Sequence, residues 1–228
     1  MTAFTEKVKL RRLKRTIVIV DASHIAKLDT PVRAALINSL PSVKPAVLLG
    51  TQSTDGQSNL CVINSCFHIG ANPALLGFIL RPNPDGVERH SLDNILTNEQ
   101  MTLNAITADM ISRAHHTSAR FPRNVSEFDA CGFSELHRES FNAPFVSESP
   151  LKIGLNLAEH QLLAINSTHL IIGAVEYLEF TDAAWRADGS LDLATMGIVG
   201  SVGLDSYHGI GEGKRFAYAK ADRPPETL

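Results

Sequence analysis

The chain has 228 residues, a formal net charge of −3, 44% hydrophobic residues and 20% charged residues. These values fit one globular domain, which we expect to span residues 1–228 with a core at about 40–220. The slight negative charge argues against general nucleic-acid binding. No stretch approaches the roughly 20 apolar residues of a membrane-spanning helix. We therefore expect neither nucleic acid nor a membrane as a partner.

Three cysteines, Cys61, Cys66 and Cys131, make an odd number and contain no CxxC pair. This pattern predicts free thiols in a reducing compartment, the cytoplasm, and no metal site. The sequence separation of Cys61 and Cys66 predicts that they face opposite sides of a strand. The basic run from Lys7 to Arg15 is interpreted as a solvated tail. The apolar residues 17–20 after it are too few for a signal-peptide core.

The first half of the chain predicts one helix followed by strands. Thr30-Pro31 is typical of a capped helix start, and the helix should end before Pro41. Thr54-Asp55-Gly56 is a hairpin turn signal. The predicted strands of this half are Ala46–Gly50, Leu60–Phe67 and Ala74–Leu80.

The second half continues mainly with strands. Helices are predicted from Ser91 onward and at Ala108–Ser118, and residues 119–149 are predicted to be irregular. Asp188-Gly189 predicts a turn, and the glycine-rich stretch Gly197–Gly213 contains Tyr207-His208. The predicted strands here are Met101–Thr107, Leu151–Ile165 and His169–Phe180. Strands joined by short turns predict a mainly β fold, an antiparallel barrel with a few helices.

A turn-rich loop, Arg81 to Asn94, contains three basic side chains, Arg81, Arg89 and His90. It leads into the predicted helix, whose N-cap would be Ser91. A helix start with a hydroxyl group and nearby guanidinium groups can hold a phosphate. Neither GxGxxG nor a P-loop motif is present, so the site would not be of the Rossmann or P-loop type. A capped surface turn is the alternative.

A second candidate site lies at the end of the strand Leu60–Phe67. Small polar residues there could hydrogen-bond a flat heteroaromatic ring, with Phe67 beside it. The run reads Asn64, Ser65, Cys66, Phe67 and His68. Together with the basic loop, it predicts a site for a phosphorylated, planar cofactor. HExxH and GxSxG are absent, and the neighbouring His115 and His116 would point about 100° apart on a helix, so we predict no metal site and no catalytic triad.

From Pro45 onward the sequence resembles the flavin reductase-like family with the FMN-binding split-barrel fold, the group that includes flavoredoxin. The segments that are similar to the family are Leu48–Leu60, Ser65–Pro82, Glu88–Ile95, Pro144–Leu155 and Gly203–His208. The resemblance implies a six-stranded antiparallel split barrel and a homodimer with FMN near the dimer interface. It also implies reduction by a nicotinamide cofactor, NADH or NADPH.

The resemblance also assigns residues. Ser65, Cys66 and Phe67 stand where the family's strand-end motif meets the flavin, although many members have serine or threonine followed by an aromatic residue there. His68 stands where many members have asparagine. The family's basic–x–Ser/Thr–x–x–Asn pattern, which meets the FMN phosphate, is matched by Arg89, His90, Ser91 and Asn94, with Arg81 and Pro82 just before them.

Tyr207 and His208 are expected close to the flavin ring, on a loop whose glycines permit movement over a nicotinamide. A surface position for both is the alternative. The predicted activity is that of an NAD(P)H-dependent flavin or small-acceptor reductase, in which the cofactor performs the hydride chemistry. A flavoredoxin-like electron carrier, reduced by a redox partner protein, and a barrel that only binds flavin are the other hypotheses.

Overall fold

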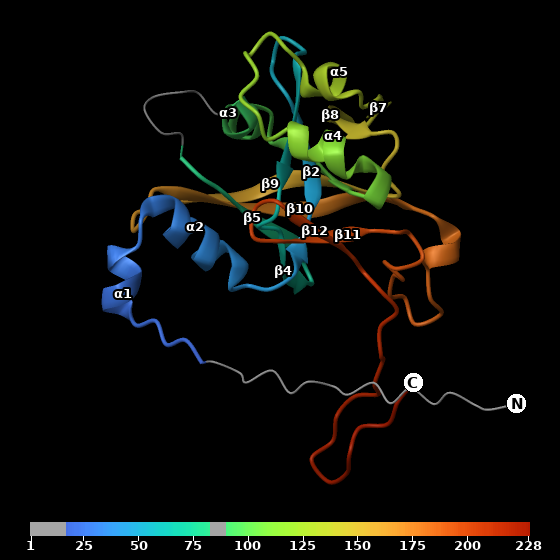
Figure 1. Ribbon diagram of the computed structural model, residues 1–228. Helices are drawn as coiled ribbons and strands as arrows, with labels where there is room; N and C mark the ends of the chain where they lie inside the picture. The colour runs from blue at the N-terminus through green and yellow to red at the C-terminus, as the bar shows by residue number, and fades with distance from the viewer. Residues whose placement is uncertain (1–16, 83–89) are drawn as a thin grey trace, which may run out of the picture.

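The computed structural model describes residues 17–82 and 90–228, and one large antiparallel sheet forms its centre (Figure 1). Seven strands pair in the order β3-β2-β6-β9-β10-β5-β4. Their bounds are β2 Val47–Gln52, β3 Ser58–Ile63, β4 Phe67–Ala71, β5 Ala74–Leu80, β6 Gln100–Ala105, β9 Leu151–Leu163 and β10 Thr168–Phe180. The consecutive strands β3 and β4 thus lie at opposite edges of the sheet. The predicted split barrel is confirmed, with seven strands in its sheet rather than six.

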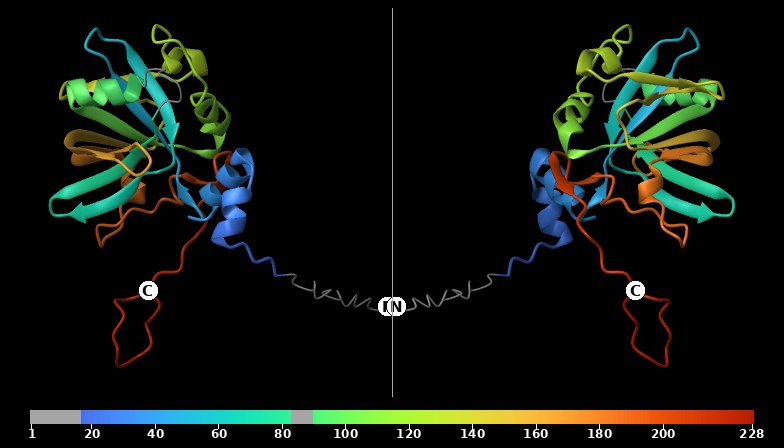
Figure 2. Two further views of the ribbon diagram at one scale, coloured as in Figure 1. Left: turned by 90° about the vertical axis from the view of Figure 1, so that its left-hand side faces the viewer. Right: turned by 90° about the vertical axis from the view of Figure 1, so that its right-hand side faces the viewer.

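Two smaller sheets and five α-helices complete the described part of the chain. The strands are β1 Lys44–Pro45, β11 Val199–Val202 and β12 Ser206–Gly209 in one sheet, and β7 Glu135–Arg138 and β8 Phe141–Val146 in the other. The helices are α1 Ala22–Lys27, α2 Thr30–Ser39, α3 His90–Asn98, α4 Ile111–His116 and α5 Glu127–Cys131, with single 3-10 turns at Ala108–Met110 and Asp182–Ala184. Figure 2 shows α1 and α2 along one flank of the barrel.

Strand β2 contributes to two apolar cores because successive side chains of a strand point to opposite faces. Leu49 packs inside the barrel with Phe78 and Leu155. Leu48 packs on the other face with Leu60 and Phe128, in a cluster that includes residues of α4 and α5. No helix of the described residues is long and apolar enough to cross a membrane.

The connection between β3 and β4 carries the chain from one edge of the barrel sheet to the other. The Ser65 hydroxyl group donates to the Ile79 carbonyl at 2.9 Å and accepts from the Ile79 amide at 3.1 Å. The Ser65 side chain therefore makes the two hydrogen bonds with Ile79 that the backbone of a neighbouring strand would otherwise make. The predicted strand Leu60–Phe67 is therefore confirmed as far as Ile63, where β3 ends, but its predicted end is wrong because Phe67 begins a new strand that pairs with β5.

Several predicted elements are confirmed with small shifts of their bounds. The hairpin at Thr54-Asp55-Gly56 joins β2 and β3, and β5 has the predicted bounds. Helix α2 begins at Thr30, but its N-cap is Asp29 and it ends at Ser39. The predicted helix Ala108–Ser118 is a 3-10 turn followed by the shorter α4. The basic run Lys7–Arg15 lies outside the described residues.

The prediction that residues 119–149 are irregular was wrong, because this segment contains α5 and the β7–β8 hairpin. Long-range contacts stabilise it. The Glu127 carboxylate accepts a hydrogen bond from the Leu60 amide at 2.9 Å, and Phe128 and Phe145 are fully buried. None of these contacts leaves a periodic pattern in the local sequence.

Candidate functional site

A pocket of about 610 Å³ is bordered by α2, the β3–β4 connection and the ends of β5 and β9. Its lining residues are Asn38, Pro41, Lys44, Val62, Ile63, Asn64, Ser65, Ile79, Leu80, Arg81, Leu163, Asn166, Thr168 and Leu204. The set contains two cations, Lys44 and Arg81, and no aspartate or glutamate. We call this space the basic pocket.

The two cations are held by neighbouring oxygen atoms. Arg81 Nη2 donates to Asn38 Oδ1 at 2.8 Å, and Lys44 Nζ donates to the carbonyl oxygens of Asn38 at 3.2 Å and Gly203 at 3.0 Å. Burial lowers the pKa of Lys44, and the charge of Arg81 lowers it further. An anion between the two side chains would relieve this repulsion, so the basic pocket is suited to a phosphate group.

Asn64 and Lys44 meet at the turn of the β11–β12 hairpin. Asn64 Nδ2 donates to the Gly203 carbonyl at 2.9 Å, the same oxygen atom that accepts from Lys44. Gly203 has φ of +65°, a left-handed conformation that glycine adopts without steric cost. The turn therefore joins the β3–β4 connection to the β1 end of the basic pocket. The sequence analysis missed Lys44, since a single lysine before a proline carries no motif.

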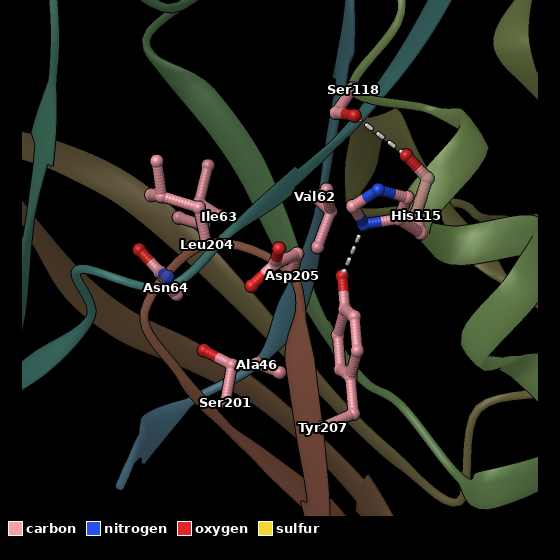
Figure 3. Close-up of a pocket in the computed structure, with 10 residues that line it drawn as sticks. All are labelled: Ala46, Val62, Ile63, Asn64, His115, Ser118, Ser201, Leu204, Asp205 and Tyr207. Carbon is pink, nitrogen blue, oxygen red and sulfur yellow. Dashed lines mark hydrogen bonds between the residues drawn. The ribbon is translucent and has the colours of Figure 1, made fainter. Parts of the chain in front are cut away.

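A second pocket of about 350 Å³ adjoins the basic pocket, and the two share Val62, Ile63, Asn64 and Leu204 (Figure 3). Its other lining residues are Ala46, His115, Ser118, Ser201, Asp205 and Tyr207. We call it the hairpin pocket, because the β11–β12 hairpin supplies one of its walls.

Helix α4 places His115 on the opposite wall of the hairpin pocket. The Thr117 hydroxyl accepts from the Val62 amide at 2.8 Å, and Ala114 is fully buried, so α4 is fixed against β3. His115 Nδ1 lies 3.1 Å from the Tyr207 hydroxyl, and the two rings meet edge to face. The sequence analysis considered His115 only as a metal ligand beside His116. Its side chain is exposed, but it also pairs with a residue 92 positions away.

The predicted phosphate loop divides between described and undescribed residues. Helix α3 begins at His90, one residue before the predicted cap. The Ser91 hydroxyl accepts from Asn59 Nδ2 at 3.0 Å, and Asn94 Nδ2 donates to Thr51 Oγ1 at 3.1 Å. Both side chains are buried and join α3 to the β2–β3 hairpin. Arg89 lies outside the described residues, and its role as a phosphate ligand stays a prediction.

The other predicted residues are distributed over different surfaces. His90 and Asn94 border a small recess beside Asn59, and Pro82 is exposed. Cys66, Phe67 and His68 line an apolar groove of about 400 Å³ between β4 and the β1–β11 strands. Of the predicted residues that the structure describes, Asn64, Ser65 and Arg81 meet in the basic pocket, and Asn64 and Tyr207 meet in the hairpin pocket.

The sequence analysis made two predictions about the cysteines, one on their thiol state and one on the faces of the strand to which they point. None of the three cysteines forms a disulfide bond within the described part of the chain, and burial raises the pKa of Cys66 to about 11. The prediction that Cys61 and Cys66 face opposite sides was wrong: both pack against the barrel core, because Cys66 lies in the connection and not on β3. No group of histidine, cysteine, aspartate and glutamate side chains among the described residues could hold a metal ion.

Tyr207 and His208 are neighbours on β12 and therefore point to opposite faces of the hairpin. Tyr207 is half-buried in the hairpin pocket, whereas His208 is exposed and its Nε2 lies 2.8 Å from the Ser206 hydroxyl. Burial raises the pKa of Tyr207, and the Asp205 charge raises it further, so its hydroxyl group stays protonated at neutral pH.

A family model described as the flavin reductase like domain matches residues 42–202, which include the barrel sheet and most of the residues that line the two pockets. Leu204, Asp205 and Tyr207 of the pocket linings lie beyond it. The chain belongs to this family. The N-terminal helices α1 and α2 lie outside the matched region, although Asn38 of α2 contributes to the basic pocket.

Solved structures support the assignment of this flavin reductase-like protein. A candidate flavin reductase with a split barrel domain from Shewanella frigidimarina is 40% identical, with a TM-score of 0.84, over 89% of this chain and 100% of that one. The 2-nitrobenzoate 2-nitroreductase of Pseudomonas fluorescens is 16% identical, with a TM-score of 0.76, over 91% of this chain and 98% of that one. Flavoredoxin of Desulfovibrio vulgaris is 21% identical, with a TM-score of 0.65, over 79% of this chain and 91% of that one. The last two similarities show a shared fold.

Proposed function

We propose that this protein is an FMN-binding oxidoreductase that takes a hydride from NADH or NADPH and passes electrons to a flavin or another small acceptor. The family establishes the flavin reductase-like character of the chain. FMN as the flavin, and a nicotinamide cofactor as the donor, are our proposal.

The basic pocket is the observation that supports FMN most directly. Its volume of about 610 Å³ lies within the range of roughly 300–1,000 Å³ that is usual for cofactor sites. Lys44 and Arg81 supply two positive charges, and no carboxylate is found among the described residues that line the pocket. A terminal monophosphate matches this pair, which is why we expect FMN to bind in preference to FAD. The residues present therefore fit the group.

We assign roles to the chain's own residues. Lys44 and Arg81 hold the phosphate in this proposal. Arg89, His90, Ser91 and Asn94 are the phosphate residues that the family resemblance implies, and His90 and Asn94 border a recess separate from the basic pocket. Asn64 and Ser65 orient the ring from the β3–β4 connection, whereas Cys66, Phe67 and His68 line the apolar groove and their contact with the ring stays a prediction. Tyr207 and His208 influence reduction from opposite faces of the hairpin. Bound FMN supplies the hydride-accepting chemistry, so the protein requires no nucleophile or metal of its own.

We also propose that the protein is a homodimer. The edge strand β4 exposes Phe67 (43%) and Ile69 (39%), and the apolar groove of about 400 Å³ lies beside it. Edge strands with apolar side chains are commonly covered in native proteins. A second copy could cover this edge and bring the β3–β4 connection, and thus the flavin, close to the interface. We expect the protein to act in the cytoplasm.

The test is to titrate the purified protein with FMN and with FAD and to record the visible absorbance spectrum. We then measure NADH and NADPH oxidation with and without added flavin. Saturable FMN binding and nicotinamide turnover support the reductase. A yellow protein that is reduced only by a redox partner protein would make it an electron carrier, and a protein without flavin affinity would refute both functions.

A further inference from the structure

The hairpin pocket is lined by a residue whose buried hydroxyl group has no hydrogen-bond partner among the described residues. Ser201 is one of the residues that line this pocket, its Oγ atom is buried, and the residue as a whole is only 3% exposed. Buried hydroxyl groups are normally hydrogen-bonded, because leaving one unpaired costs about 1–3 kcal/mol. A ligand or an ordered water molecule with an acceptor or donor atom at this position would satisfy it.

The surroundings of Ser201 restrict the ligand. Ser201 and Tyr207 are directly opposite each other on β11 and β12, so both side chains leave the same face of the hairpin. Figure 3 shows the Tyr207 hydroxyl beside the His115 ring, with Asp205 between this pair and Asn64 in that view. Hydroxyl, imidazole and amide groups thus gather around the pocket and offer donors to an oxygen atom of a ligand.

Charge and shape restrict it further. Asp205 is the acidic residue of the pocket lining, and no lysine or arginine belongs to that lining, so an anionic ligand is disfavoured. Ala46, Val62, Ile63 and Leu204 supply apolar walls. A volume of about 350 Å³ accommodates a single substituted ring.

We propose that the hairpin pocket binds an uncharged, unsaturated or aromatic ring that carries a carbonyl oxygen, which accepts a hydrogen bond from Ser201 Oγ with Tyr207 on the same wall. The inference rests on the proposed function only in giving this ligand the role of the small electron acceptor. The binding itself depends on the chain alone. The shared wall of Val62, Ile63, Asn64 and Leu204 places such a ligand beside the basic pocket.

Acetophenone and benzoate are a matched pair of probes, since they have nearly the same shape and differ in charge. Nuclear magnetic resonance of the isotope-labelled protein would follow the amide signals of Ser201 and Tyr207 and the ring signals of His115 during titration with each probe, with and without FMN. We expect saturable shifts with acetophenone and weaker binding of benzoate. Asp205→Asn should reduce this difference.

Ser201→Ala removes the hydroxyl group and leaves the backbone of β11 unchanged. It should weaken acetophenone binding about threefold to tenfold, the usual range for one neutral hydrogen bond. Ser126→Ala is the matched control, because Ser126 Oγ is also buried without a partner but lies at the start of α5, outside the hairpin pocket. It should leave acetophenone binding unchanged.

Three results would overturn the inference. They are the absence of saturable shifts, equal acetophenone affinity in Ser201→Ala and the unmodified protein, and displacement of acetophenone by FMN. The first two would mean that water alone satisfies Ser201, and the third would assign the hairpin pocket to the flavin. Because FMN binding is measured separately by absorbance, a protein that binds FMN but not acetophenone refutes only this inference. A protein that binds acetophenone but not FMN refutes only the proposed function.

Discussion

Replacement of Arg81 by alanine tests whether the basic pocket holds the FMN phosphate. The side chain is exposed at the pocket edge, and its guanidinium group is already oriented by Asn38 Oδ1 at 2.8 Å. A hydrogen bond between charged groups contributes about 1.5–3 kcal/mol, and solvent exposure favours the lower end. A loss of about 1.5 kcal/mol corresponds to roughly tenfold weaker FMN binding.

The assay is titration with FMN and with riboflavin, which lacks the phosphate. Arg81→Ala should change riboflavin affinity less than about twofold, since only the phosphate contact is removed. Arg33→Ala is the charge-matched control, because Arg33 of α2 donates to the Leu28 carbonyl at 2.9 Å and does not line the basic pocket. The control should bind FMN normally.

The comparison of FMN affinity with riboflavin affinity decides whether Arg81 contacts the phosphate. If Arg81→Ala weakened FMN and riboflavin equally, the substitution would have damaged the pocket in general, and the phosphate assignment would be wrong. If neither affinity changed, the phosphate would lie elsewhere. The Lys44→Met variant extends the test. It should weaken FMN binding more than Arg81→Ala does, because Lys44 is more buried than Arg81. Lys44 also anchors the Gly203 carbonyl, so riboflavin binding must be measured as the control for damage to the pocket.

Further measurements test other parts of the structure. Arg89→Ala should weaken FMN binding by about one to two orders of magnitude and spare riboflavin; an unchanged FMN affinity would remove Arg89 from the site. Light scattering at micromolar concentration should give about twice the chain mass, and a monomer with full flavin content would contradict the dimer. Burial opposes the ionisation of Glu179, but hydrogen bonds from Arg138, Lys152 and Tyr177 outweigh it and hold its pKa at about 2, against an ordinary 4.5. The unfolding free energy should therefore be highest above about pH 4.5 and fall by about 1–2 kcal/mol as the pH drops to 2, and Glu179→Gln should flatten this decline in denaturant titrations.

The sequence by itself determined the elements whose information is local. The hairpin at Thr54-Asp55-Gly56, strand β5 and the long pair β9 and β10 follow from turn residues and from runs of β-forming side chains, so their positions could be predicted closely. The family resemblance gave the split barrel and pointed to the β3–β4 connection. Asn64, Ser65 and Arg81, which the sequence analysis proposed as site residues, line the same pocket, and their roles stay predictions.

Only the tertiary structure decided how the sites are assembled. Lys44 and Gly203 are 159 positions apart, and His115 and Tyr207 are 92 apart, so no local pattern brings them together. The end of β3 at Ile63 depends on the Ser65 side chain meeting Ile79 across the barrel. A strand or turn is specified by neighbouring residues, whereas a pocket is formed by loops whose ends the folded sheet brings together, and that is why its composition emerged only from the fold.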